Sequence, residues 1–320
     1  MATVIEEPKK SLSRGRSLWA YAAHRFIRNK KGLVCLFLIV LLYGMGILAP
    51  WVAPYHYDQQ NLNITLKSPS WEHPFGTDRL GRDMFSRVIY GVRTTVIVTI
   101  AAMATGGLLF GIALGLISGY FGRLVDNVIM RIGEVFLAFP DILLVILIAA
   151  TVKPRVVEWV HYIEDTTRIT GLMKSGIVDY LVVFGALAVV SWVGMARLVR
   201  GQVLSLKQSQ YILAARAIGA SHWRIIFHHI FPNLLPPLIV VLSVGMGSIA
   251  GSEVMLSWLG LGVQPPVPSL GVMIFDNGDI SVLRTTPYLL LFPVATVAII
   301  IFAFNLLGDA LNDALNPRAR

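Results

Sequence analysis

Ionisable residues at or within apolar runs that are long enough to cross a membrane include Glu134, Asp141, Arg197 and Glu253. A charged side chain at the centre of a bilayer costs roughly 2.5–3.5 kcal/mol on insertion scales, so such residues face protein or water rather than lipid. Asp141 follows a proline, where a kink frees backbone carbonyls, and Glu253 follows Ser252 in a helix rich in small residues. We therefore expect Glu253, Asp141 and Ser252 to line a hydrophilic path. Helix–helix pairing or a shallow interfacial position is the alternative for each of them.

The sequence holds no pattern that supports enzyme chemistry. It lacks a GxxxxGK[ST] phosphate loop and an HExxH zinc motif, so the chain itself is not expected to bind or hydrolyse ATP. All seven histidines lie outside the cores of the apolar runs. The adjacent His228 and His229 point in different directions on a helix, which disfavours chelation of a metal. Asp309 follows Leu-Leu-Gly and lacks the first glycine of a GxGD protease pattern. We expect no catalytic residue, no metal site and no cofactor bound by this chain.

The composition is that of a membrane protein with several spans. Of the 320 residues, 55% are hydrophobic and only 14% are charged, whereas a soluble domain carries roughly 25% charged residues. The single cysteine, Cys35, excludes a disulfide framework. Six apolar runs have the roughly 17–25 residues that a membrane-spanning helix needs, and they lie at residues 32–52, 94–117, 127–150, 180–198, 234–256 and 287–307.

The net charge of +9 is distributed as a topology signal rather than as a surface for nucleic acid. Six spans place both termini on one side, and most of the 27 Lys and Arg residues lie there if that side is the cytoplasm, as the positive-inside rule requires. The basic leader precedes a run of spanning length, which predicts a signal anchor. Residues 1–16 are expected to be disordered. Residues 18–31 are expected to form a short helix in the membrane interface, or else a basic flank that fixes topology.

Residues 211–232 form a polar insert between the fourth and fifth apolar runs. Alanines favour a first helix, Gly219 favours a turn, Ser221 can cap a second helix, and Pro232 is expected to end it. This helix–glycine–helix unit on the cytoplasmic face suits docking in the groove of a partner, with an ordinary amphipathic loop as the alternative. The residues expected to carry the contact are Tyr211, Ala214, Ala215, Arg216, Gly219, Ala220, Ser221, His229 and Pro232.

The second apolar run carries glycines at four-residue spacing, Gly107, Gly111, Gly115 and Gly119. Residues four apart lie on one face of a helix, and a face of glycines lets a neighbouring backbone approach closely. We expect these four glycines to pack against another helix.

Several motifs resemble, in order and over almost the whole chain, the permeases of the dipeptide/oligopeptide (peptide/nickel) ABC importer family. Ala214, Ala215, Gly219 and Pro232 stand at the positions of the family's "EAA" loop, with Leu213 in place of the glutamate. Residues 73–83, HPFGTDRLGRD, are similar to the family's HPFGTDxxGRD signature, and residues 253–266 are similar to its ExxLSFLGLGxQPP segment. The tail at residues 303–318 resembles the family's FNLLGDxLRDxLDP run.

This resemblance implies a C-type permease subunit with the all-α, polytopic, type I ABC importer permease fold: six transmembrane helices and an N-terminal elbow helix at the interface. The EAA loop would be the coupling helix that seats in a separate ATPase. The implied partners are a second homologous permease, two ATPase subunits that bind ATP and Mg, and an extracytoplasmic substrate-binding protein. The implied function is uptake of dipeptides or oligopeptides across a bacterial or archaeal cytoplasmic membrane by alternating access. Nickel chelates or glycosides are alternative cargoes.

Two rivals come from other classes of protein, a membrane scaffold that holds a soluble partner and a proton-coupled carrier that depends on Glu253 or Asp141. Residues 152–179 have no counterpart in the family and are expected to form a mixed-charge outside loop with a short helix at 156–163. The expected organisation is a tail and elbow helix at 1–31, a first span and outside segment at 32–93, a permease core at 94–308 with the coupling loop at 201–233, and a C-terminal tail at 309–320.

Overall fold

The computed structural model describes residues 18–168, 171–173 and 175–315, and the disorder expected for residues 1–16 lies outside this range. Over the described residues the backbone is helical apart from turns, loops and one isolated bridge between Thr77 and Asp83. The all-α fold class expected from the sequence is confirmed. The helices are α1 (Leu18–Arg28), α2 (Lys30–Ile47), α3 (Ala49–Val52), η1 (Leu62–Ile64), α4 (Met84–Ala102), η2 (Met103–Gly111), α5 (Ile112–Phe121), α6 (Arg123–Leu137), α7 (Asp141–Thr167), α8 (Ile177–Leu206), α9 (Gln210–Ala217), α10 (His222–Arg224), η3 (Ile225–Ile230), α11 (Phe231–Trp258), α12 (Leu270–Asp276), α13 (Ile280–Thr285) and α14 (Tyr288–Leu315).

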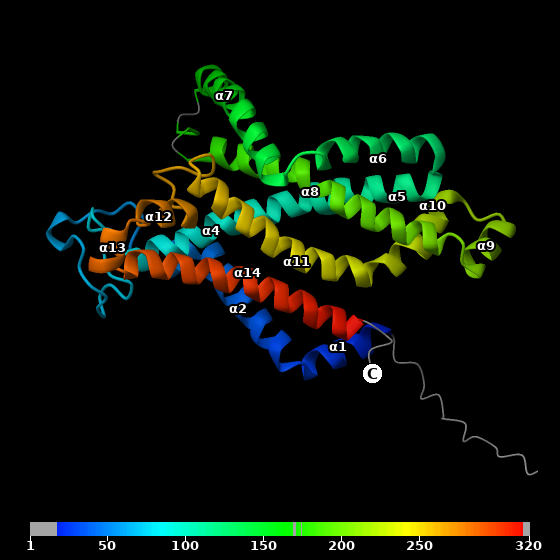
Figure 1. Ribbon diagram of the computed structural model, residues 1–320, viewed down its shortest axis with the longest axis horizontal. Helices are drawn as coiled ribbons and strands as arrows, with labels where there is room; N and C mark the ends of the chain where they lie inside the picture. Colours follow the sequence, from blue (N-terminus) through cyan, green and yellow to red (C-terminus); the bar gives the residue numbers. More distant parts are fainter. Residues whose placement is uncertain (1–17, 169–170, 174, 316–320) are drawn as a thin grey trace, which may run out of the picture.

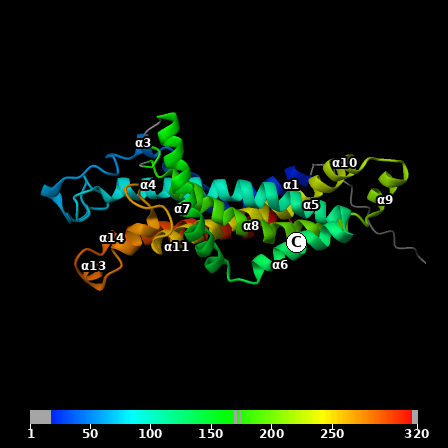
Figure 2. The ribbon, with the colours of Figure 1, turned by 90° about the horizontal axis from the view of Figure 1, so that it is seen from above.

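The long helices run along the long axis of the molecule, and the functional segments lie at its two ends (Figure 1). One end carries α9 and α10, and the other carries α12, α13 and the loop before α4 (Figures 1 and 2). In the middle, α8 packs along α4, η2 and α5, while α14 packs against α11 and α2. The short α1, which is the helix expected near the N-terminus, lies against α14 and α2.

Five helical stretches are long and apolar enough to cross a membrane: α2, residues 84–121, α8, residues 222–258 and α14. Each contains or overlaps one of the six runs expected from hydropathy. The stretch from Met84 to Phe121 has 38 residues, which at 1.5 Å per residue is about 57 Å, well beyond the roughly 30 Å hydrocarbon core. It begins ten residues before the expected boundary because Asp83 caps it, accepting the Ser86 amide at 2.7 Å.

The third expected span, residues 127–150, is not one straight helix. It is divided between α6 and α7, which meet at 91° across residues 138–140. Pro140 has an extended backbone (ψ 128°) and lacks an amide hydrogen, and a proline also disfavours helical geometry at the residue before it. α6 packs back along α5 and α8, and α7 packs against α8 as well, at an angle to the long helices (Figure 1). A sixth span exists only if this bent pair is counted as one.

The described residues of the segment 152–179 form more helix than the sequence predicts. α7 continues to Thr167, and Val160 is buried in a cluster with Val178 and Val182 at the start of α8. Lys153 forms an ion pair with Asp179 at 2.7 Å. The apolar contacts and this ion pair hold α7 against α8, so the helix extends well beyond the short stretch expected at 156–163.

Two further predictions, the helix end at Pro232 and the C-terminal tail, need correction. Pro232 does not end a helix, because helical backbone runs without interruption from His222 to Trp258. The turn before it is the π-helix η3, in which the Phe231 amide donates to Ile226 O, five residues back. This wider turn lets the chain pass a proline that cannot donate. The expected C-terminal tail begins as helix, since α14 extends to Leu315, and the rest of it lies outside the described residues.

The glycine ladder packs against α8, but with one change of register. A Cβ placed on Gly111, Gly115 or Gly119 would meet Met195, Val199 or Val203 of α8 at 2.6, 2.6 and 2.7 Å. Gly107 instead faces Met103 of its own helix, and Gly106 takes its place, where a Cβ would lie 2.4 Å from Ala188 O. The π-helix η2 covers this region, and its wider turn makes the first step of the ladder five residues long.

The Gly115 contact can be tested by adding a single methyl group. We expect Gly115→Ala to destabilise the protein by about 1–3 kcal/mol, because the methyl group would be forced into Val199 and Ala196 O. Gly194→Ala on α8 is the matched control. Its Cβ would meet nothing within 4 Å, so helix propensity should stabilise it by about 0.5–1 kcal/mol. Thermal unfolding followed by size-exclusion chromatography in detergent measures both, and equal midpoints would contradict the close packing of α5 on α8.

Candidate functional site

Residues 209–230 form the helix–turn–helix segment at one end of the molecule. α9 ends in a Schellman motif, in which the Gly219 amide donates to Arg216 O and the Ala220 amide to Ala215 O, both at 3.0 Å. This geometry places Gly219 at φ +82°, a region that glycine occupies without strain. Ser221 then caps α10 by accepting the Arg224 amide at 3.4 Å. The local signals of Gly219 and Ser221 therefore act as the sequence predicts.

Buried isoleucines pack this segment against the helix bundle. Ile212, Ile225, Ile226 and Ile230 are at most 4% exposed, and they pack in one cluster with residues of α5, α8 and α11. Fully burying a side chain of this kind contributes about 1.5–3 kcal/mol. The segment thus shares one apolar cluster with three helices, so a displacement of the segment would disturb its packing against all three.

Polar contacts fix the turn to the end of α5. The Arg216 guanidinium lies over the Tyr120 ring, 5.3 Å from its centroid, a cation–π contact. The Tyr120 hydroxyl is in turn 2.8 Å from His222 Nδ1. Arg216 therefore contacts its own chain as well as solvent. Tyr120 and His222 were not predicted from the sequence, since no spacing rule relates residues 102 positions apart.

A second polar group holds α6 beside this end of the bundle. Asp126 of α6 accepts two hydrogen bonds from the Arg200 guanidinium of α8, one of them 2.6 Å long at Nη2, and one from the Ser118 hydroxyl of α5. Lys207 Nζ donates to Gly119 O at 3.0 Å. Bidentate pairing of this kind is directional as well as strong. It joins α5, α6 and α8 close to the segment 209–230.

Four large apolar side chains of the segment are uncovered. Leu213, Ile218, Trp223 and Phe227 are 51–86% exposed, and the rings of Trp223 and Phe227 stack with centroids 5.8 Å apart. Large exposed apolar side chains grouped on one segment mark an interaction surface. Of the residues expected to carry the partner contact, those exposed are Tyr211, Ala214, Arg216, Gly219, Ser221 and Pro232, those half-buried are Ala220 and His229, and Ala215 is buried.

Glu253 does not line a path in this conformation. It is 0% exposed and accepts hydrogen bonds from the hydroxyls of Thr95 at 2.7 Å, Ser257 at 2.9 Å and Ser269 at 3.4 Å. These contacts join α11 to α4 and to the residue that precedes α12. The helix-pairing alternative therefore describes Glu253 better.

The other two candidates for a hydrophilic path are more accessible. Ser252 is half-buried, and Asp141 is exposed at the first turn of α7, next to the 91° bend. A carboxylate there is stabilised by the positive end of the helix dipole. The structure does not bring Asp141, Ser252 and Glu253 into one hydrogen-bonded group, because every protein partner of Glu253 is a hydroxyl.

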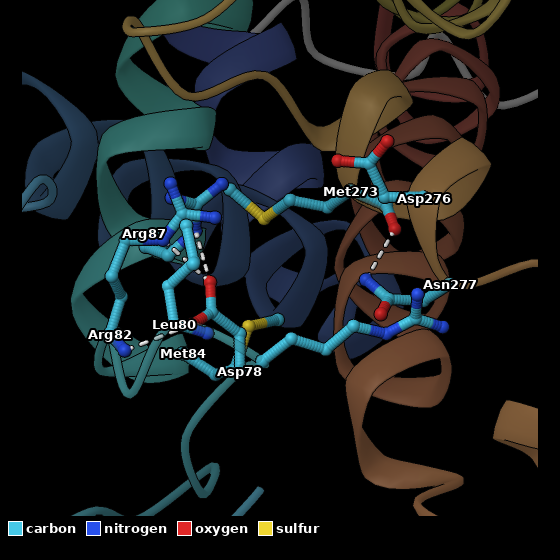
Figure 3. A pocket seen from close by; sticks show the side chains of 9 residues that line it. Asp78, Leu80, Arg82, Met84, Arg87, Met273, Asp276 and Asn277 are labelled. Atoms are coloured by element: carbon cyan, nitrogen blue, oxygen red, sulfur yellow. Dashed lines mark hydrogen bonds and ion pairs between the residues drawn. The ribbon is translucent and has the colours of Figure 1, made fainter. Parts of the chain in front are cut away.

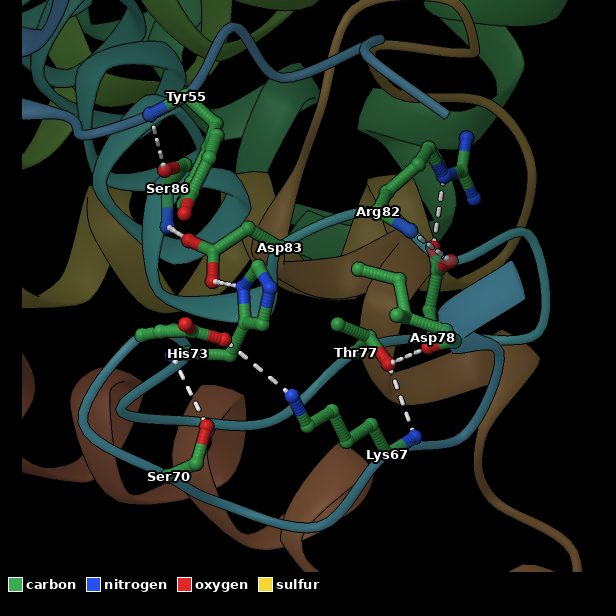
Figure 4. A network of polar contacts seen from close by, with 11 residues as sticks. Tyr55, Lys67, Ser70, His73, Thr77, Asp78, Arg82, Asp83 and Ser86 are labelled. Atoms are coloured by element: carbon green, nitrogen blue, oxygen red, sulfur yellow. Dashed lines mark hydrogen bonds and ion pairs between the residues drawn. The ribbon is translucent and has the colours of Figure 1, made fainter. Parts of the chain in front are cut away.

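At the other end of the molecule, the segment 67–87 folds around two aspartates (Figure 4). Asp83 accepts the Ser86 amide and lies 2.9 Å from His73 Nδ1. Asp78 accepts the amides of Leu80 and Arg82 at 2.9 Å and Arg82 Nε at 2.7 Å. Within the described part of the chain, no group of three or more His, Cys, Asp and Glu side chains is arranged to hold a metal ion.

Two family models match the chain. The model described as "binding-protein-dependent transport system inner membrane component" matches residues 111–320, and the model described as "N-terminal TM domain of oligopeptide transport permease C" matches residues 17–69. Together they cover the first span, part of the outside segment, and everything from the end of η2 onward.

Curated relatives match over almost their whole length. The chain is 38% identical to the dipeptide transport system permease protein DppC of Alkalihalophilus pseudofirmus, over 95% of this chain and 91% of that protein. It is also 38% identical to the oligopeptide transport system permease protein OppC of Bacillus subtilis, over 98% and 92%. An inward-facing structure of the MetNI methionine ABC transporter is similar in fold, with a TM-score of 0.53 and 20% identity, covering 73% of this chain and 98% of that one. Sequence family and fold agree, and the chain belongs to the binding-protein-dependent transport system inner membrane components, the permease subunits of ABC importers.

Proposed function

We propose that this chain imports dipeptides or oligopeptides across a bacterial cytoplasmic membrane, driven by ATPase subunits that dock on residues 209–230. The observation that carries the proposal is that this segment has both buried apolar side chains, which pack on the bundle, and exposed apolar side chains. Four of its five isoleucines are buried against α5, α8 and α11. The fifth, Ile218, is left uncovered together with Leu213, Trp223 and Phe227. A surface fixed to the spans on one side and apolar on the other suits the transfer of a partner's movement to the membrane helices.

The peptide cargo is inferred from relatives, whose names specify dipeptide and oligopeptide transport. The proposal includes a second permease chain, two ATPases that bind ATP and Mg, and an extracytoplasmic binding protein that delivers the cargo. The basic residues predicted to lie in the cytoplasm put both termini and the segment 209–230 on the ATPase side. Leu213, which is 51% exposed where the family pattern has a glutamate, makes this docking surface more apolar.

Docking can be tested at Ile218, which is 86% exposed. We expect Ile218→Asp to lower both peptide uptake and the amount of co-purified ATPase by at least about tenfold, since a charge in a buried apolar contact is costly. Ile280→Asp is the control, because Ile280 is 70% exposed but lies on α13 at the other end (Figure 1). Affinity purification from the native membrane in mild detergent, followed by mass spectrometry, measures the ATPase. Equal recovery with both variants would contradict docking at this segment.

The turn at Gly219 gives a second test, which acts through the backbone conformation of the segment. We expect Gly219→Val to uncouple ATP hydrolysis from uptake, because a β-branched residue at φ +82° is strained by roughly 1–2 kcal/mol. Gly219→Asn should transport normally, since asparagine tolerates the left-handed region. A Cβ has nothing within 4 Å at this position, so the two variants differ in backbone preference rather than in steric fit. Uptake of a labelled dipeptide and ATPase rate are measured together, and equal behaviour of Val and Asn would exclude a role for the turn.

Glu253 separates the importer from the proton-coupled carrier. We expect Glu253→Gln to retain uptake, since the amide can still pair with the surrounding hydroxyls. Glu253→Ala should destabilise the protein by about 1–3 kcal/mol for each hydroxyl left without a partner. Uptake with ATP supplied and the proton gradient collapsed is the measurement. Loss of uptake in the well-folded Gln variant, together with dependence on the gradient, would favour the carrier.

A further inference from the structure

A cavity of about 310 Å³ lies at the end of the bundle that carries α12, opposite the segment 209–230 (Figure 3). Its charged lining consists of three arginines and two aspartates: Arg79, Arg82, Arg87, Asp78 and Asp276. Most of these residues lie in or just before the first turn of α4, and Asp276 lies at the end of α12, which faces them across the cavity in Figure 3. Two segments far apart in the sequence therefore build one charged cavity.

The aspartate closest to the arginines already accepts three hydrogen bonds. Asp78 accepts two backbone amides with Oδ1, and Oδ2 accepts Arg82 Nε at 2.7 Å. Arg87 Nε is 3.7 Å from the same Oδ2, beyond hydrogen-bonding distance. Asp78 thus supplies charge to Arg87 without forming a hydrogen bond to its Nε.

Arg87 is the unusual member of this group. Its side chain is 7% exposed, and its buried Nε has no hydrogen-bond partner among the described residues. Leaving a buried charged donor without a partner is costly, and native proteins rarely do so without a functional reason. Arg87 also lines the cavity, so its guanidinium, though not the covered Nε atom itself, is the group that an acceptor entering the cavity would meet.

The lining indicates which acceptor fits. Three arginines against two aspartates leave one positive charge, which matches a monoanion better than a doubly charged phosphate. The planar guanidinium fork matches a carboxylate through paired hydrogen bonds. Met84 and Met273 supply apolar walls beside the arginines, and the volume is at the lower end of small-molecule sites. The cavity has room for a carboxylate together with the rest of one amino-acid residue.

We propose that this cavity binds a carboxylate of a peptide-like molecule, a C-terminal residue or an acidic side chain, with Arg87 as the anchoring residue. The rest of the ligand lies against the two methionines, and Asp276 faces its polar backbone or amino group. Binding here is independent of the ATPase docking proposed for residues 209–230, so either property can fail without the other.

Binding of defined probes to the full complex in nanodiscs tests the site. N-acetyl-alanine carries a terminal carboxylate, the α-amide of N-acetyl-glutamate carries a side-chain carboxylate, and N-acetyl-alaninamide carries neither. We expect one or both carboxylates to bind with a Kd on the order of 1 mM by saturation-transfer NMR, and the neutral amide not to bind. The stronger of the two identifies the source of the carboxylate. Absence of binding by both, equal binding by the amide, or equally strong competition by inorganic phosphate would overturn the proposal.

Substitutions assign the binding to Arg87. Arg87→Met should weaken carboxylate binding by at least about tenfold, while the thermal midpoint without ligand stays equal or rises. The substitution removes a buried donor that has no hydrogen-bond partner, and Asp78 keeps its hydrogen bonds to Arg82 and to two backbone amides. Arg284→Met, an exposed change on α13 away from the cavity, should bind like the parent. If the Met variant does not fold, Arg87→Lys keeps the charge without the planar fork and should still bind several-fold more weakly. Parental affinity in the folded Arg87 variants would show that the guanidinium is not the anchor.

Discussion

The close contact between α5 and α8 is the constraint on which the rest of this structure depends. Gly111 at the end of η2 and Gly115 and Gly119 of α5 leave no room for a side chain against α8. Van der Waals contact between this bare glycine face and the side chains and carbonyls of α8 therefore holds the helices together. Tyr120 at the end of α5 and Val203 near the end of α8 belong to the same cluster as the buried isoleucines of residues 209–230. The glycine contact therefore also positions the platform on which that segment rests.

Two π-helices adjust this frame without breaking it. η2 widens one turn between α4 and α5, which moves Gly106 rather than Gly107 onto α8, and η3 lets the chain pass Pro232 into α11. Both long helical stretches remain continuous as a result. α11 thus connects η3, the last part of the segment 209–230, with Glu253. The hydroxyl partners of Glu253 lie on α4, on α11 itself and just before α12. A movement imposed at one end of α11 has a mechanical route to the other end.

Local signals predict this fold well, and tertiary contacts account for the rest. Hydropathy locates all six apolar runs, and Gly219 and Ser221 act as turn and cap because both roles depend on neighbouring backbone alone. Pro140 indicated a kink, but the size of the bend, 91°, was not predicted, since a hydropathy sum carries no direction. Gly106 faces α8 in place of Gly107 because η2 is a π-helix, whereas the four-residue spacing of the glycines assumed a regular α-helix. The sequence identifies Glu253 as an ionisable residue within an apolar run. It does not show whether Glu253 faces water or hydroxyls, because one of its partners, Thr95, lies 158 positions away.

Glu253 on α11 and Arg87 at the start of α4 are both buried ionisable groups, but their surroundings are opposite. The difference separates a side chain with a structural role from one that is available to a ligand. Glu253 has hydrogen bonds from three hydroxyls and no accessible surface, so its polar capacity is met within the chain. Arg87 is almost as buried, yet its Nε has no partner and its side chain lines a cavity. A satisfied carboxylate stabilises the joint between helices and has little capacity left for a ligand. An unsatisfied guanidinium costs stability in the empty protein, and this cost is recovered only when a molecule with a matching acceptor enters.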